Sequence, residues 1–278
     1  MLVDWGPWER GDERGSCERG DIKSFPPVSF FSLSFPSLAL SLVRPTMSDL
    51  PDYVLDPDAV LKDTSTWRHG NAPDYSKTRA FYEKTKTKAH EPGSLPFLVE
   101  NLVKNWEIEA SFKTNLSDWR TIDHDVYTVS VNGGERRTGH HMLEVGTYNA
   151  LLTASQYYDP TKNTFDDSHK SFKRMMPTFA WEVLEVYSGP PVVVCRWRHW
   201  GDMKHDYVGF NSSGEKVKVV AHGGPIDIEG LIVAKVNDKL QVQSLDVWYD
   251  PMTMFRQISK GGQISSESSS SGCPFVQG

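Results

Sequence analysis

The chain has 278 residues, of which 38% are hydrophobic and 24% charged, and its formal net charge is −6. This length is enough for one sizeable domain or two small ones. Its 9 Trp, 10 Tyr and 13 Phe residues can form a core, which excludes a wholly disordered chain. The acidic balance provides no broad basic face and argues against a nucleic-acid binder. Three scattered cysteines, Cys17, Cys195 and Cys273, suit neither a disulfide framework nor a zinc cluster, and indicate a reducing, cytoplasmic setting.

Residues 1–46 differ in composition from the rest of the chain. A transmembrane helix needs about 20 predominantly apolar residues, but prolines and serines interrupt the apolar run of Ser24–Val43. A signal peptide has a basic start and an early apolar core, whereas this N-terminus carries both charge signs. We therefore interpret residues 1–46 as a disordered or non-native extension, expect no membrane segment, and read Met47 as a natural start.

Residues 47–93 are polar and rich in Pro and Gly. One short helix is expected within Asp74–Ala89, and the rest should form an N-terminal arm that packs on the domain through its aromatic side chains. From Ser94, a good N-cap, apolar residues recur at helical spacing and predict the strongest helix over Leu95–Lys113. The main domain is expected over 94–259.

A hairpin and two further helices are expected next. Asp125–Val131 alternates and meets Asn132-Gly133, which is typical of a hairpin turn, so a return strand is expected over Glu135–Met142. Helical stretches are expected over Glu144–Ser155 and Asp166–Met175.

The remaining sequence is strand-like. The expected strands are Thr178–Ser188, Val192–Gly201, one strand made of Lys216–Ala221 and Ile226–Asn237 with a break between them, and Leu240–Asp250. Residues 260–278 form a Gly/Ser-rich tail that is expected to be flexible. This order of elements predicts an α+β fold with helices on one face of a curved, mainly antiparallel sheet. Such a sheet leaves a cavity with an open mouth, which is the default ligand site.

Alternation along two strands indicates which side chains share a face. In the second long strand Trp197 and His199 lie on one face. In the last strand Asp246, Trp248 and Asp250 lie on one face. A one-residue bulge would exchange the two faces, so either face of a strand could line the cavity.

Seven motifs carry a resemblance to a known family, and they are Trp67-Arg68-His69-Gly70, Glu91-Pro92-Gly93-Ser94-Leu95, Lys104-Asn105-Trp106-Glu107-Ile108-Glu109, Gly146-Thr147-Tyr148-Asn149-Ala150, Glu182-Val183-Leu184-Glu185-Val186-Tyr187-Ser188, Arg198-His199-Trp200-Gly201 and Ser271-Gly272-Cys273-Pro274. These motifs resemble the plant and fungal pathogen-related proteins. The match runs in a single order along the chain, from about Trp67 to Pro274. That family implies a defence or stress context and no settled reaction.

The last third of the chain resembles the SnoaL-like polyketide cyclases of the NTF2-like superfamily. The relevant residues are Gly209, Gly214-Glu215-Lys216-Val217, Leu240–Tyr249, Asp250-Pro251 and Phe255-Arg256-Gln257. The resemblance implies a cone-shaped α+β barrel. It does not fix the activity, because the superfamily includes cyclases, dehydratases, isomerases and binding modules.

The resemblance gives Asp250 an acid/base role, since in SnoaL-like cyclases an Asp at the end of the last strand has that function. In an apolar cavity its charged form would be disfavoured, and it could exchange protons near neutral pH. The alternative is a cap of the turn before Pro251. If Asp246 and Asp250 shared a site, their two carboxylates would push each other's pKa values apart. The alternative for Asp246 is a place on a solvated strand face. The His that accompanies the Asp in the cyclases has no match, because Lys235-Val236 occupies that region.

His199 is the imidazole best placed to pair with Asp250, for enolisation or dehydration; its alternative is a hydrogen-bonded histidine at a strand end. The expected ligand-binding residues are Trp106, Glu109, Tyr148, Asn149, Trp197 and Trp248. Trp106 could instead belong to the core, and Asn149 could hold a neighbouring segment. Because successive helix residues diverge by about 100°, Glu107 and Glu109 cannot both face inward, and Glu109 is the expected one.

Neither a metal site nor a cofactor is expected, because the histidines lack a third ligand at useful spacing and the sequence has no Gly-rich phosphate loop. The sequence is thus interpreted as a cofactor-free enzyme that performs acid/base chemistry on a small hydrophobic metabolite. The alternatives are a non-catalytic stress protein that binds such a ligand and a protein-interaction module. The outer sheet face carries Arg196 and Arg198. These residues are either solvated or form the contact of a homodimer.

Overall fold

The computed structural model describes residues 49–260 and 264–267. The expectations for residues 1–46, and for most of the 260–278 tail, lie outside the described residues. Among the helices of the described part, none is long and apolar enough to cross a membrane.

Six strands form the main sheet, in the order β2-β1-β8-β7-β4-β3. Their bounds are β1 Thr128–Val131, β2 Arg137–Thr138, β3 Ala180–Ser188, β4 Val192–Asp202, β7 Pro225–Val236 and β8 Val242–Trp248. All neighbours are antiparallel except β1 and β8, which are parallel. Register shifts interrupt β3 and the β7–β8 pair, and such bulges bend a sheet. The expected β3–β4–β7–β8 meander is confirmed.

A second sheet has the order β5-β6-β9, with β5 Tyr207–Phe210, β6 Lys216–Val219 and β9 Ile264–Glu267. The prediction that Lys216–Ala221 and Ile226–Asn237 form one broken strand was wrong, because β6 and β7 belong to different sheets. The segment between them contains Gly and Pro and lets the chain change sheets. Residues 264–267, expected in the flexible tail, pair with β6.

The helical elements lie mostly before the strands of the meander. They are α1 Asp52–Leu55, η2 Ala59–Lys62, α2 Ser76–Thr85, α3 Leu95–Phe112, η3 Leu116–Asp118, α4 Gly139–Val145, α5 Thr147–Leu151, α6 Phe165–His169, the π-helical turn η4 Lys170–Arg174, and α7 Pro251–Ile258. The predicted long helix after Ser94 is confirmed as α3. The helix predicted over Asp166–Met175 is confirmed as α6 with η4.

The return strand predicted over Glu135–Met142 was mostly wrong. The hairpin turn at Asn132-Gly133 exists, but β2 has only two residues and α4 follows directly. The Thr138 hydroxyl accepts a hydrogen bond from the backbone N–H of His141 and so caps α4. Gly146, at φ +91°, then separates α4 from α5, and a side chain there would collide with Phe165.

Polar side chains of α3 hold the arm that precedes it. The Asn105 side chain accepts a hydrogen bond from the Val60 backbone N–H and donates to the carbonyls of Tyr53 and Asp56. The buried Glu100 carboxylate accepts hydrogen bonds from Tyr82 of α2 and from Lys104. The arm is therefore fixed to the face of α3 by specific bonds as well as by its aromatic rings.

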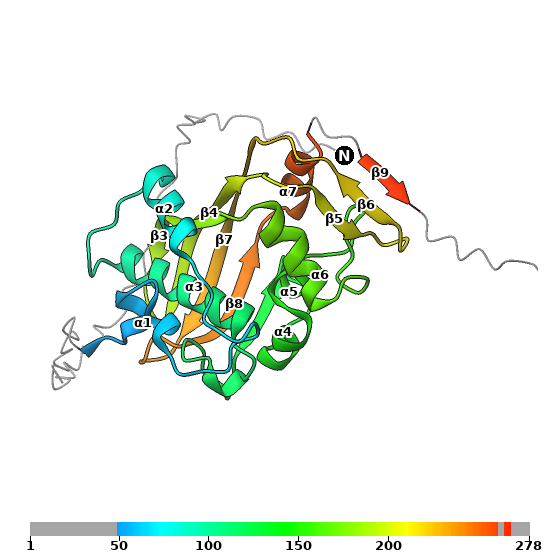
Figure 1. The fold of residues 1–278 in the computed structure, drawn as a ribbon. Coiled ribbons are helices and arrows are strands. Elements are labelled where there is room, and N and C mark those ends of the chain that lie inside the picture. Colours follow the sequence, from blue (N-terminus) through cyan, green and yellow to red (C-terminus); the bar gives the residue numbers. More distant parts are fainter. Residues whose placement is uncertain (1–48, 261–263, 268–278) are drawn as a thin grey trace, which may run out of the picture. The chain divides into compact units, whose positions relative to one another are not determined.

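In Figure 1, helices α3, α5 and α6 lie over one face of the long strands β3, β4, β7 and β8. This arrangement confirms the expected α+β class, with helices on one face of a mainly antiparallel sheet. The expectation of a barrel needs correction, because within the described residues β2 and β3 remain at the two edges and the main sheet stays open. The cavity described below lies between the sheet and these helices.

Candidate functional site

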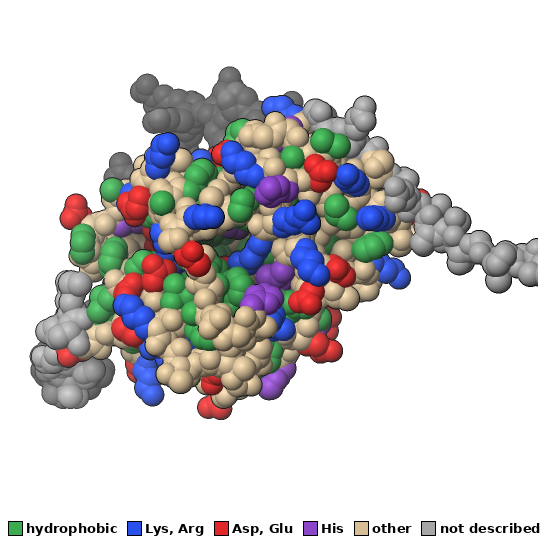
Figure 2. Space-filling model, viewed as in Figure 1, with side chains coloured by type: hydrophobic (Ala, Val, Ile, Leu, Met, Phe, Trp, Pro, Cys, Tyr) green, Lys and Arg blue, Asp and Glu red, His purple; other side chains and the backbone are tan. Residues whose placement is uncertain are grey.

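A cavity of about 260 Å³ lies between the inner face of the main sheet and the helices. Its walls are mostly apolar and aromatic, and include Trp106, Phe112, Phe179, Trp181, Trp197, Ile228, Ile232, Leu245, Val247, Tyr249 and Met254. Figure 2 shows hydrophobic side chains within a hollow on this face, with charged side chains and histidines around it. A mostly dry site with few polar groups is typical of a small-molecule pocket.

Strand β4 supplies two of the expected site residues. Trp197 and His199 share the inner face of β4 and line the cavity, as alternation along the strand indicated. Gly230 of β7 lies beside the Trp197 ring, where a Cβ would come within 2.3 Å of a ring carbon. Only glycine therefore leaves room for the Trp197 indole in this wall.

His199 presents an unusual imidazole to the cavity. Its Nδ1 lies 2.7 Å from the carbonyl oxygen of Ala180. Because a carbonyl only accepts, Nδ1 carries the proton, and Nε2 of the neutral ring keeps its lone pair. Burial lowers the pKa of His199 to about 4, although the Ala180 carbonyl opposes the shift. At neutral pH His199 is thus an uncharged base.

Tyr148 of α5 also lines the cavity. Its ring stacks on Phe172 with centroids 4.6 Å apart. Burial, with the nearby charge of Glu107, raises the pKa of Tyr148, so its phenol stays protonated. The hydroxyl makes no hydrogen bond within the described residues, which leaves its proton available to a ligand. Trp106 of α3 lines the cavity as well and donates its indole N–H to Tyr127 at 3.0 Å.

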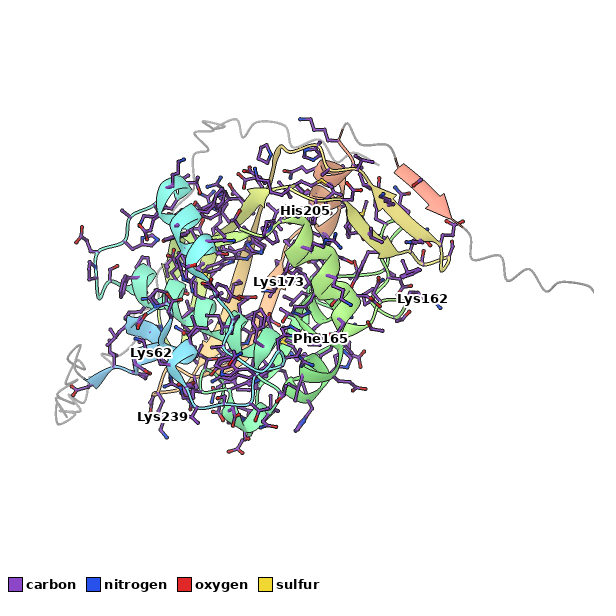
Figure 3. The ribbon with its side chains drawn as sticks, in the orientation of Figure 1. Lys62, Lys162, Phe165, Lys173, His205 and Lys239 are labelled. Carbon is purple, nitrogen blue, oxygen red and sulfur yellow. The ribbon has the colours of Figure 1, made fainter. Side chains whose placement is uncertain are left out.

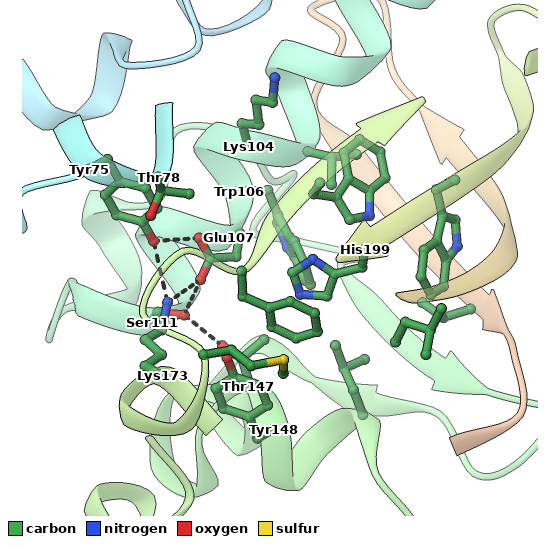
Figure 4. A pocket seen from close by; sticks show the side chains of 18 of the residues that line it. Tyr75, Thr78, Lys104, Trp106, Glu107, Ser111, Thr147, Tyr148, Lys173 and His199 are labelled. Carbon is green, nitrogen blue, oxygen red and sulfur yellow. Dashed lines mark hydrogen bonds and ion pairs between the residues drawn. The ribbon is translucent and has the colours of Figure 1, made fainter. Parts of the chain in front are cut away.

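A cluster of five polar side chains lies at the helical side of the cavity (Figure 4). We call it the Glu107 cluster, and its members are Tyr75, Glu107, Ser111, Thr147 and Lys173. The Lys173 ammonium lies 2.7 Å from Oε1 of Glu107. The Tyr75 hydroxyl donates to Oε2, and the Ser111 hydroxyl donates to Oε1 at 3.0 Å. The arm, α3, α5 and η4 therefore meet in one set of hydrogen bonds.

The Glu107 carboxylate is fixed in its charged form. Burial by itself would raise its pKa, but the Lys173 ammonium and the hydrogen bonds from Lys173, Tyr75 and Ser111 outweigh burial and lower the pKa to about 2. Glu107 is therefore an ionised hydrogen-bond acceptor at neutral pH rather than a proton carrier. Figure 3 shows Lys173 near the middle of this face of the molecule.

Asp250 lies outside the cavity, which corrects the expectation that it pairs with His199. Its side chain, 53% exposed, caps α7 by accepting from the backbone N–H of Met252, and it pairs with Arg256. Partial desolvation would raise its pKa, but Arg256, Met252 and Thr253 together lower it. Asp250 therefore has the alternative role considered for it, that of a cap before Pro251.

Asp246 and Trp248 lie on the outer face of β8, because Leu245, Val247 and Tyr249 fill the inner one. The Asp246 carboxylate accepts from Ser130 at 2.6 Å and pairs with Arg136 at 2.9 Å. Trp248 is 46% exposed. The expectation that these residues line the cavity needs correction, since β8 presents the opposite face to the helices.

Glu109 and Asn149 are buried, and their side chains form hydrogen bonds with backbone groups. Glu109 accepts from Lys113 and from the backbone N–H groups of Arg120 and Thr121. The Asn149 amide donates to the carbonyls of Val145 and Asn163 and accepts from Tyr158. Only one of the two glutamates faces the cavity, as helix geometry required, but it is Glu107 rather than Glu109.

The Glu107 cluster was not foreseen from the sequence. Positions 103, 107 and 111 share one face of α3, so helical spacing could have placed Glu107 and Ser111 together. Lys173 and Tyr75 are 98 residues apart, and no local pattern brings them together. Among the described residues, no group of three or more His, Cys, Asp or Glu is placed to hold a metal ion.

Comparison with known proteins gives one curated relative and several solved structures. No family model matches the chain. A pathogen-related protein of Hordeum vulgare is 29% identical over 222 residues, which cover 77% of this chain and 90% of the relative. It confirms the resemblance that the motifs indicated.

The similar solved structures include a candidate polyketide cyclase from Acidithiobacillus ferrooxidans, which is 13% identical with a TM-score of 0.36 over 62% of this chain and 99% of that one. A candidate SnoaL-like polyketide cyclase from Jannaschia sp. is 14% identical with a TM-score of 0.33 over 61% and 98%. A protein with a ketosteroid isomerase-like fold from Catenulispora acidiphila is 11% identical with a TM-score of 0.32 over 56% and 90%.

Proposed function

We propose that this chain is a cofactor-free enzyme that binds a small hydrophobic secondary metabolite in the cavity and catalyses proton transfer. Cyclisation, dehydration and isomerisation are reactions of this kind. The observation that carries the proposal is the neutral His199, whose Nδ1 proton is committed to Ala180 while Nε2 remains a base on the cavity wall. Such a base abstracts a proton from carbon where the developing negative charge of the substrate stabilises the imidazolium that forms.

His199 and Tyr148 have complementary roles in this proposal. Nε2 of His199 removes a proton from the carbon next to a carbonyl group, and the electron pair of the broken C–H bond forms an enolate. The Tyr148 hydroxyl donates a hydrogen bond to the oxygen on which negative charge develops. The imidazolium then returns its proton to another carbon for isomerisation or to a leaving hydroxyl for dehydration. Asp250 takes no part.

A non-catalytic binding protein is the second candidate function. The observation that favours it is the fixed charge of Glu107, which leaves His199 without a second proton carrier in the Glu107 cluster. In that case the cavity would hold the metabolite unchanged, in the defence or stress context that the resemblance implies.

The two candidates are separated by a chemical probe for a buried base, 5-nitrobenzisoxazole. A base removes the proton on its carbon 3 while the ring N–O bond breaks, and coloured 2-cyano-4-nitrophenolate forms. We expect the chain to accelerate this opening above the buffer rate, and His199→Gln to lower the acceleration at least tenfold. The rate should increase as the pH rises through about 4, where His199 loses its proton, and stay level above.

Two matched variants are the controls. His205→Gln changes an exposed histidine, and Asp250→Asn keeps the cap of α7, so both should open the ring as fast as the parent. An unchanged rate in His199→Gln would contradict the catalytic role. Binding of the probe, followed by tryptophan fluorescence, without any acceleration in the parent would favour the non-catalytic candidate.

We further propose a homodimer through the outer sheet face and a cytoplasmic location. On that face Val194, Leu231 and Val233 are half-buried, and Arg196 is exposed. Arg198 already pairs with Glu182 and Asp227. The location is supported by Cys195, a buried free thiol in the described part of the chain.

A further inference from the structure

The direction of each hydrogen bond in the Glu107 cluster can be worked out from donors and acceptors. The ionised Glu107 only accepts, so the Ser111 hydroxyl gives it its single proton. The Ser111 and Thr147 oxygens lie 3.2 Å apart, and Thr147 must therefore donate to Ser111. The Tyr75 proton also goes to Glu107. All three hydroxyl protons of the cluster are thus committed within the protein.

Lys173 and Thr147 of the cluster keep hydrogen-bonding positions that the protein does not use. Lys173 donates to Glu107 at 2.7 Å and to Tyr75 at 3.4 Å, which leaves one of its three N–H groups. Thr147, whose proton goes to Ser111, keeps a lone pair on its hydroxyl oxygen. The cluster therefore offers one donor, on Lys173, and beside it the Thr147 oxygen as an acceptor, with further lone pairs on Glu107, Ser111 and Tyr75.

We infer that the Glu107 cluster is a subsite for a neutral hydroxyl group of the ligand, held by Lys173 and Thr147. A hydroxyl is the simplest group that accepts one hydrogen bond and donates another. It accepts from the free N–H of Lys173 and donates to the oxygen of Thr147. This inference deepens the proposed function, because it concerns the ligand of the same cavity.

Charge excludes the main competing ligand group, a carboxylate. The Lys173 charge is already balanced by Glu107, so an anionic ligand would add an unpaired negative charge to a mostly apolar cavity. Burying such a charge costs far more than one hydrogen bond returns. The other two cations of the lining are occupied as well, Arg79 by Asp58 at 2.7 Å and Lys104 by Glu100 at 2.7 Å.

The cavity size limits the rest of the molecule. The cavity has a volume of about 260 Å³. One or two fused rings fill such a space, and the aromatic walls favour flat rings. The substrate class is therefore a neutral hydroxylated one- or two-ring compound, with a carbonyl group that reaches Tyr148 and His199.

Four naphthalene probes of similar size test this subsite in the full chain by their fluorescence. 6-Acetyl-2-naphthol has the hydroxyl, 2-acetylnaphthalene lacks it, 6-methoxy-2-acetylnaphthalene only accepts, and 6-acetyl-2-naphthoate is an anion. We expect the naphthol to bind about tenfold more tightly than 2-acetylnaphthalene. The methoxy probe should bind less tightly than the naphthol, and the naphthoate weakest of the four.

Three variants locate the effect. Thr147→Val keeps the side-chain shape and should remove the naphthol's advantage over the methoxy probe. Lys173→Met should reduce the preference for the naphthol over 2-acetylnaphthalene to less than twofold. Lys170→Met changes an exposed lysine on the same η4 turn and should behave as the parent. If Lys173→Met fails to fold, Thr147→Val still decides the question.

Equal binding of the naphthol and 2-acetylnaphthalene by the parent would overturn the subsite, as would tightest binding of the naphthoate. Both results leave the proposed function standing, since ring opening by His199 is measured with a probe that has no hydroxyl. Conversely, an unchanged ring-opening rate in His199→Gln would contradict the catalytic role but leave the measured naphthol preference in place. The Glu107 cluster would then be the hydroxyl subsite of a non-catalytic binding protein.

Discussion

The fate of a polar side chain in this protein depends on the partners it already has. His199 has one nitrogen paired and one free, and burial keeps it neutral. Asp250 has Arg256, Met252 and Thr253 as partners, and they keep it charged and exposed at the start of α7. The resemblance to the cyclases suggested Asp250 as an acid/base group, and strand alternation suggested His199, but only His199 reaches the cavity.

The residue scale also shows why sequence could place one of these groups and not the other. Alternation along β4 placed Trp197 and His199 together, because that strand runs without interruption from Val192 to Asp202. Asp250 was expected to continue the last strand. That strand instead ends at Trp248, because Asp250 and Pro251 form the cap and first residue of a helix.

The low pKa of His199 makes a prediction about stability. Its pKa is about 4 in the folded chain and about 6.5 when unfolded, and His169 behaves in the same way. Between these pH values the unfolded chain binds more protons, so the free energy of unfolding should fall as the pH decreases from 7 towards 4. Urea unfolding at several pH values should show a shallower fall for His199→Gln. Equal slopes for parent and variant would contradict the shift.

At the scale of elements, α3 serves both the cavity and the arm, and the arm itself reaches the cavity at Tyr75. One face carries Glu107 and Ser111 to the cavity, and another carries Asn101 and Asn105 to the arm. The helix was predictable from its apolar spacing and its start after Ser94. The partners of its polar residues were not, because they come from segments tens of residues away.

Asn105 provides a test of the contact between α3 and the arm. Its truncation in Asn105→Ala leaves the buried N–H of Val60 and the carbonyls of Tyr53 and Asp56 without partners. We expect a loss of about 2–3 kcal/mol in the free energy of unfolding, measured with urea. Asn115→Ala, at an exposed position just after α3, is the control and should change it by less than about 0.5 kcal/mol. Equal effects would show that these bonds do not stabilise the arm.

For the whole molecule, the order of helices and strands was enough to predict the α+β class and the four-strand meander. It was not enough to predict the excursion into a second sheet, since local pattern does not tell which strands pair. Nor could it predict the Glu107 cluster, which joins the arm, α3, α5 and η4. The position of the cavity, between the sheet and the helices, could thus be predicted from the sequence. The polar groups that line it could not, because distant segments bring them together only in the folded chain.

The proposed homodimer is tested at the same scale. Arg196 is exposed on the outer face of β4, opposite Leu231 of β7. Light scattering of the parent should give twice the chain mass at micromolar concentration. Arg196→Glu should shift the mass towards one chain while ring opening of the probe persists, because the residue lies on the face away from the cavity. A parent with the mass of one chain at all concentrations would contradict the dimer.

The state of the His199 ring is the feature on which the proposed chemistry depends, and nitrogen NMR of histidine-labelled protein measures it directly. Comparison with His199→Gln identifies its signals. We predict a neutral ring with the proton on Nδ1, unchanged between pH 8 and 5, whose Nε2 signal moves when 2-acetylnaphthalene is added. A ring that titrates near pH 6.5, or one that carries its proton on Nε2, would contradict a neutral base facing the cavity.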